Sequence, residues 1–167
     1  VNGAVGISAG YATNIPPHNL GEVIDATIKR IDSPNCYLET IMDIVKGPDF
    51  PTGGIVEGKN GIIDAFKTGR GKVVVKPKYE IVTDKNKTSI IISQIPFEVN
   101  KLLLVSKMNE IKIDKKIDGI IDVRDESDRQ DPVRIVVEIK KDADPNFILN
   151  YFYKNTDLMI NYNYNMV

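Results

Sequence analysis

The sequence predicts a mixed α+β fold: an antiparallel sheet of ββα-type units packed by helices, preceded by a Gly/Pro-rich loop and two helices. The main observation is that, beyond residue 71, β-rich segments come in pairs and a helical pattern follows each pair, before one closing strand. Composition agrees, because 167 residues with 42% hydrophobic and 27% charged side chains can enclose a globular core. This length accommodates one domain and part of a neighbour.

The first twenty residues carry no charged side chain and include Gly3, Gly6, Gly10 and two adjacent prolines. Glycine and proline at this density set unusual backbone angles, so the segment is expected to be a loop and not the interior of a strand or helix. Ile7 is its one bulky aliphatic residue ahead of Ile15. An uncharged loop that presents such a side chain suits close approach to a partner surface.

Helix signals occur at five places along the chain. Asn19 followed by Glu22 resembles a capping box, and the helix that it opens is expected to end near Ser33-Pro34. Apolar spacing and flanking Gly, Pro, Asn or Asp residues predict the other helices at about 37–46, 62–67, 100–113 and 144–156.

Strand patterns fill the second half of the chain. Alternating or β-branched runs predict strands at 72–82, 88–95, 117–123, 133–139 and 159–166. Asp84-Lys85-Asn86 is expected to form the hairpin turn between the first two of these strands.

Basic residues gather between positions 67 and 78 without an acidic residue among them: Lys67, Arg70, Lys72, Lys76 and Lys78. If 72–78 is one continuous strand, Lys72, Lys76 and Lys78 share a face, and the other face carries Val73, Val75 and Pro77. Such a face could follow the phosphates of a nucleic acid. It could equally be a solvated outer face whose lysines protect a sheet edge. The net charge of −1 does not by itself indicate a nucleic-acid binder.

Other motifs point to no catalytic or metal chemistry. The run Gly53 to Asn60 approaches a phosphate-binding P-loop, but Asn60 replaces the Ser or Thr that would hold Mg²⁺. The acidic stretch around Arg124-Asp125-Glu126 lacks the glycine and distal glutamate of a calcium loop, which favours a turn with local ion pairs. His18 has no cysteine or second histidine nearby in the sequence to complete a metal site.

The opening twenty residues resemble the loop after the active-site tyrosine in the cleavage subunit, called the A subunit, of bacterial type IIA topoisomerases, the gyrase and topoisomerase IV family. The resemblance extends over essentially the whole chain, through segments 47–52, 68–72, 95–96, 99–101 and 124–128. Segments 7–11 and 157–167 are more similar to topoisomerase IV than to gyrase. Gln130-Asp131-Pro132 departs from the family's shorter, glycine-containing turn.

The resemblance implies an internal fragment, with residues 1–32 from the DNA-breakage domain and 33–167 from the tower domain. The parent would be the cleavage subunit of an ATP-dependent enzyme that cuts double-stranded DNA through paired tyrosines. That tyrosine, in an Arg-Tyr context, would lie upstream of Val1, so no residue here is expected to be catalytic. The parent A subunit would form a homodimer and bind the B subunit of topoisomerase IV, which would hold ATP and Mg²⁺. We expect a cytoplasmic protein with no membrane association.

The resemblance also implies the DNA-binding residues. Ile7 matches an isoleucine that enters a base-pair step, with Asn2 and Ser8 as further DNA-contacting positions, and Arg70, Lys72, Lys76 and Lys78 would contact phosphates. Two alternatives stay open: a fragment of the gyrase A subunit, and a non-catalytic scaffold or interaction module. Salt-dependent affinity for duplex DNA separates binding from scaffolding.

Overall fold

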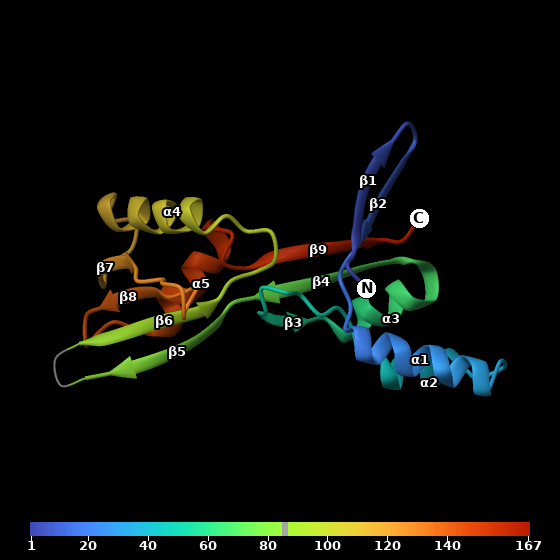
Figure 1. The fold of residues 1–167 in the computed structure, drawn as a ribbon. Helices are drawn as coiled ribbons and strands as arrows, with labels where there is room; N and C mark the ends of the chain where they lie inside the picture. The colour runs from blue at the N-terminus through green and yellow to red at the C-terminus, as the bar shows by residue number, and fades with distance from the viewer. Residues whose placement is uncertain (85–86) are drawn as a thin grey trace. The chain divides into compact units, whose positions relative to one another are not determined.

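A computed structural model describes residues 1–84 and 87–167. The chain forms two compact units, and its course is drawn in Figure 1. The first unit contains residues 1–51, 56–74 and 161–167, and the second contains residues 52–55 and 75–160. Each unit is therefore built from more than one stretch of the sequence. The predicted domain boundary between residues 32 and 33 stays a prediction, because these compact units are defined by contacts within the chain.

The first unit contains three helices and most of a sheet, and the first two strands of that sheet form a hairpin. The helices are α1 (Leu20–Asp32), α2 (Leu38–Ile44) and α3 (Lys59–Thr68). The hairpin strands are β1 (Ala4–Ser8) and β2 (Tyr11–Ile15); most residues of β3 (Ile55–Glu57), β4 (Arg70–Lys76) and β9 (Ile160–Asn165) also belong to this unit. The strand order is β1-β2-β9-β4-β3.

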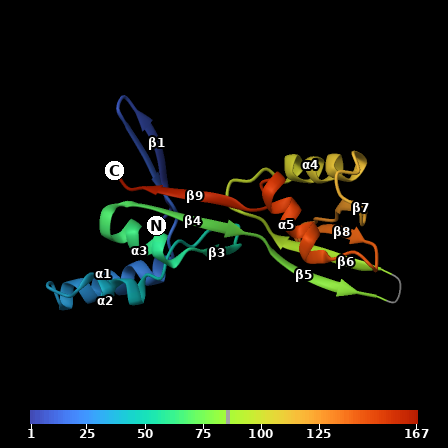
Figure 2. The ribbon, with the colours of Figure 1, turned by 180° about the vertical axis from the view of Figure 1, so that it is seen from behind.

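The second unit contains an antiparallel sheet covered by two helices, which can be followed in Figure 2. Its strands are β5 (Lys78–Thr83), β6 (Thr88–Gln94), β7 (Ile120–Asp125) and β8 (Ile135–Ile139), in the order β5-β6-β8-β7. Its helices are α4 (Lys101–Ile113) and α5 (Pro145–Asn155). The turn predicted at 84–86 includes residues 85 and 86, which lie outside the described residues.

The core of the second unit joins alternate residues of β6 and β8 to both helices. Ile90 and Ile92 of β6 are fully buried together with Met108 of α4 and Phe152 of α5. Because every second residue of a strand faces the same side, both helices pack on one face of this sheet. The predicted mixed α+β class is confirmed, although the strands form two sheets and not one.

The expected loop in residues 4–15 is instead a β-hairpin. β1 and β2 pair antiparallel with Ile7 opposite Ala12 and Ser8 opposite Tyr11. Gly10 has a φ of 82° in the turn between them, a conformation that glycine adopts without strain. The glycines lower the strand propensity of this segment, but the paired backbone groups stabilise the strands all the same.

The single strand predicted over 72–82 is wrong as well. β4 ends at Lys76 and β5 begins at Lys78, and the two strands belong to different sheets. Pro77 separates them, and a proline has no N–H to donate to a ladder, so the ladder ends there.

Local capping signals are confirmed at three helices. Asn19 Oδ1 accepts from the Glu22 N–H at 3.2 Å at the start of α1. The equivalent side-chain acceptors are Asn100 at α4 and Asp144 at α5, at 3.1 and 2.9 Å. Side-chain acceptors at these positions satisfy backbone donors that the first turn of a helix leaves unpaired.

The glycines at 61 and 71 allow α3 to lie directly on β4. A Cβ at Gly61 would overlap the carbonyl oxygen of Lys72, and one at Gly71 would overlap the carbonyl oxygen of Gly61. Gly61 and Gly71 therefore allow a close approach between helix and strand.

Candidate DNA interface

The hairpin of β1 and β2 presents an apolar side chain to solvent near its turn. Ile7 is 91% exposed, and its cross-strand partner is Ala12. Val5 lies two residues back on the same face and is 66% exposed. The segment that carries them has no charged side chain. An exposed aliphatic residue on an uncharged strand is costly in water unless another surface covers it in use.

Asn2 and Ser8, the other two predicted contacts in this region, are also exposed. Ser8 pairs with Tyr11 across the turn, on the face opposite to Ile7. Tyr11 is 71% exposed, so this face also presents a large side chain. The sequence does not single out Val5 or Tyr11 for binding, because their placement depends on the alternation of a hairpin that the glycine-rich composition conceals.

The segment that follows β2 holds the hairpin base against the helices of the same unit. The His18 backbone N–H donates to Val1 O at 2.8 Å, and the Asp49 N–H donates to Pro17 O at 2.9 Å. His18 Nδ1 lies 2.9 Å from Pro16 O, and its ring meets the Phe66 ring edge-on at 6.4 Å between centroids. Burial lowers the pKa of His18, so the neutral imidazole is the form that this environment favours.

The four basic residues predicted to contact phosphates do not lie on one strand. Arg70 and Lys72 are exposed on β4 in the first unit, two residues apart on the same face. Lys76 and Lys78 belong to the second unit, on either side of the break at Pro77. The Lys76 ammonium lies 5.9 Å from the centre of the Tyr153 ring, within the range of a cation–π contact. The expectation of a continuous basic strand is corrected to two separate pairs of charges.

Comparison with known proteins places this arrangement in a family. The family model for the A subunit of DNA gyrase/topoisomerase IV matches residues 1–167. The chain belongs to this family.

Curated relatives carry the same description over the whole chain. It is 59% identical to the A subunit of DNA topoisomerase 4 from Bacillus subtilis over 168 aligned residues, which are 100% of this chain and 21% of the relative. It is 55% identical to the protein of the same name from Streptococcus pyogenes and 54% identical to that from Staphylococcus epidermidis, covering 20% and 21% of them. The chain thus spans about a fifth of the length of these relatives.

The acidic stretch of this family member forms local ion pairs, as predicted. Arg124 donates to Asp122, Glu126 and Glu138 at 3.2, 3.1 and 2.8 Å. Its guanidinium holds the pKa of Glu138 below its usual range. Asp128 Oδ1 accepts two backbone N–H groups at 2.7 Å in the turn that follows. Within 1–84 and 87–167, no group of three or more His, Cys, Asp or Glu side chains is placed to hold a metal ion.

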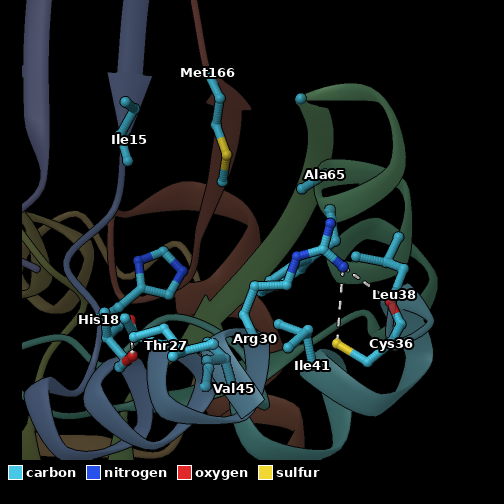
Figure 3. A pocket seen from close by; sticks show the side chains of 15 residues that line it. Ile15, His18, Thr27, Arg30, Cys36, Leu38, Ile41, Val45, Ala65 and Met166 are labelled. Carbon is cyan, nitrogen blue, oxygen red and sulfur yellow. Dashed lines mark hydrogen bonds between the residues drawn. The ribbon is translucent and has the colours of Figure 1, made fainter. Parts of the chain in front are cut away.

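An apolar cavity of about 940 Å³ lies in the first unit between α1, α2 and α3 (Figure 3). Ile15 and His18 line it from the hairpin base, and Met166 lines it from the end of β9. The Arg30 guanidinium reaches across it from α1 and donates to Cys36 O at 3.1 Å.

Among the described residues no helix is both long and apolar enough to cross a bilayer.

Proposed function

We propose that this chain is the DNA-bending part of the A subunit of a topoisomerase IV, and that Ile7 acts as its wedge. One observation carries the proposal: in a chain of this family, Ile7 is 91% exposed beside the turn of an uncharged hairpin. An apolar wedge unstacks a base-pair step at a cost of about a few kcal/mol. Closer wrapping of the bent duplex offsets that cost through additional backbone contacts.

The basic pairs supply the sequence-independent part of this binding. Arg70 and Lys72 are exposed in the unit that carries the hairpin, and Lys76 and Lys78 begin the other unit. Lysine and arginine contacts to phosphates position a duplex without reading its sequence. Ser8 is exposed next to Ile7, and Asn2 is exposed just before β1; short polar side chains of this kind can bond to sugar and phosphate oxygens.

The remaining parts of the reaction belong, in this proposal, to other regions and chains. The full-length cleavage subunit would form a homodimer whose paired tyrosines, outside this chain, cut both strands of the duplex. Its partner, the B subunit of topoisomerase IV, would bind ATP and Mg²⁺. The assembled enzyme would act in the cytoplasm, where the chromosome is.

The test replaces Ile7 with alanine in the full-length protein assembled with its partner. Energy transfer between dyes at the two duplex ends reports the bend, and titration reports the affinity. We expect Ile7→Ala to reduce bending and cleavage more than binding, because phosphate contacts carry most of the affinity.

Ile113→Ala is the matched control, because Ile113 is an isoleucine with 72% exposure at the end of α4 in the other unit. The control is expected to bend DNA like the wild type. Wild-type bending by Ile7→Ala would rule out the wedge and favour a scaffold or interaction module.

A further inference from the structure

Backbone pairing with β9 gives the hairpin little support. The register of β2 on β9 has the single pair Asn14 and Asn165 within the described chain. One residue pair leaves a two-stranded hairpin free to pivot about it, and isolated hairpins are marginally stable in water. The bonds at Pro17 and His18 hold the base of the hairpin, and the direction of its strands beyond the base depends on contacts with β9.

Asn14 uses both ends of its amide to bond to β9. Its Nδ2 donates to Asn163 O at 2.7 Å, and its Oδ1 accepts from the Tyr162 hydroxyl at 2.9 Å. Tyr162 is itself fixed, since it is 6% exposed and its ring lies 5.3 Å from that of Phe50. A rigid, buried donor thus holds the amide in one orientation.

A second set of bonds lies one step closer to the hairpin turn. Asn165 Nδ2 donates to Ala12 O at 2.7 Å, and Thr13 Oγ1 donates to Asn165 O at 3.1 Å. Asn165 Oδ1 is buried and has no hydrogen-bond partner among the described residues. The Asn165 amide therefore leaves its oxygen without a hydrogen bond, at a cost in free energy, while its nitrogen bonds to the backbone of β2. Ala12 is the residue directly opposite Ile7.

We propose that Asn14, Tyr162 and Asn165 form a side-chain clamp that sets the direction in which the hairpin presents Ile7. They are positioning residues, because they act on DNA only through the hairpin. Their hydrogen bonds at the base of the hairpin restrain a rotation that a single backbone pair would allow. This inference rests on the proposed role of Ile7 in bending DNA.

The first test measures the hairpin without DNA. Spin labels at Ser8→Cys near the turn and Lys67→Cys on α3 report a distance within one unit, in a full-length protein that is otherwise free of cysteine and carries Cys36→Ser. We expect a narrow distance distribution in the parent protein and a broad one in the double variant Tyr162→Phe, Asn165→Ala. Tyr162→Phe keeps the aromatic packing, so the fold is retained.

Asn163→Ala is the matched control, because this exposed asparagine is on the same strand and only its backbone carbonyl joins the clamp. It is expected to keep the narrow distribution. An unchanged distribution in the double variant, or equal broadening in the control, would overturn the clamp.

The second test measures bending by the unlabelled variants at saturating DNA. We expect the ratio of bent to unbent duplex to fall about fivefold for each bond removed, the factor that one hydrogen bond contributes to an equilibrium. The salt dependence of binding should not change. If the distance distribution broadens but bending stays at the wild-type level, the positioning role is wrong. Failure of the wedge itself shows separately, as wild-type bending by Ile7→Ala.

Discussion

The hairpin and the second unit use the same residue types in opposite ways. Ile90 and Ile92 on β6 are fully buried under two helices, whereas Ile7 on β1 is 91% exposed. Both strands alternate their side chains, and both belong to the same chain. The difference is that α4 and α5 cover β6, while nothing in the described part of the chain covers Ile7. The contrast teaches that burial in the second unit serves stability, and exposure on the hairpin is available for a partner.

Charge follows the same division. The second unit carries an ion-pair network around Arg124, and the hairpin has no charged side chain at all. An uncharged surface gains nothing from counterion release, so the hairpin would contribute to DNA binding through shape, apolar contact and uncharged hydrogen bonds. Three further measurements test this contrast between the hairpin and the second unit.

Truncation of a core residue should have the largest effect. Phe152→Ala is expected to destabilise the chain by about 3–5 kcal/mol, because Phe152 is fully buried between α5 and the sheet. Ile7→Ala is expected to stay within about 0.5 kcal/mol, because its side chain is already in water. Urea unfolding of the 167-residue chain gives both values.

Phe147 provides the matched control on the same helix, since it is 58% exposed. Phe147→Ala should resemble Ile7→Ala. A loss for Ile7→Ala as large as that for Phe152→Ala would show that the hairpin stabilises the fold, and the contrast would fail.

Removal of charge should have an intermediate effect, seen in binding. Replacing Lys72, Lys76 and Lys78 with glutamine in the full-length protein should make the slope of log K against log salt shallower by about 0.9 per lost phosphate contact. The weakening should be uniform across DNA sequences. Ile7→Ala should leave this slope unchanged.

The control for this set replaces three exposed lysines of the second unit with glutamine: Lys115, Lys140 and Lys154. Lys76→Gln alone is also informative, because it removes the contact with Tyr153 as well as a charge. An unchanged slope in the first triple variant would assign these lysines to a solvated face and favour the scaffold alternative.

The smallest effect concerns pH and the hairpin base. Burial lowers the pKa of His18, so the folded state binds this proton less readily than the unfolded state does. The contribution of His18 to stability is therefore complete above the ordinary histidine pKa of about 6.5 and is lost as pH falls from that value through the lowered pKa of the folded state. His18→Gln should remove this loss of stability below about pH 6.5.

Urea midpoints at several pH values in that window check the prediction. Asp122 and Glu138 beside Arg124 do not interfere, because hydrogen bonds from Lys112 and Arg124 lower the pKa of these carboxyls and move their titration to more acidic pH. A wild-type pH dependence in His18→Gln would assign the loss to another group.

The helices were predictable because their signals are local. Asn19, Asn100 and Asp144 each stand next to the backbone donor that they cap, so a few residues of sequence contain both partners. Apolar spacing then indicated the extent of α1, α4 and α5 to within a few residues. The predicted fold class follows from the order of such elements.

The hairpin and the clamp were not predictable in this way. Tyr162 and Asn14 are 148 positions apart, and no local pattern connects them. The glycines of this segment lower its local strand propensity, and β2 pairs with β9, a strand that comes about 150 residues later in the sequence. Resemblance to a family pointed to Ile7, and its exposure and the means by which it is held came only from the structure.

The interleaving of the two units has a consequence for biosynthesis. The second unit takes most of its residues from one uninterrupted stretch, 75–160, so its sheet and helices can form as soon as that stretch has left the ribosome. The first unit needs residues 161–167, and the strand that fixes the hairpin is among them. Its long-range contacts must wait for loop closure over about 150 residues, which is the slow kind of step in folding. Within these 167 residues the hairpin is therefore expected to be among the last parts to reach its final orientation during translation.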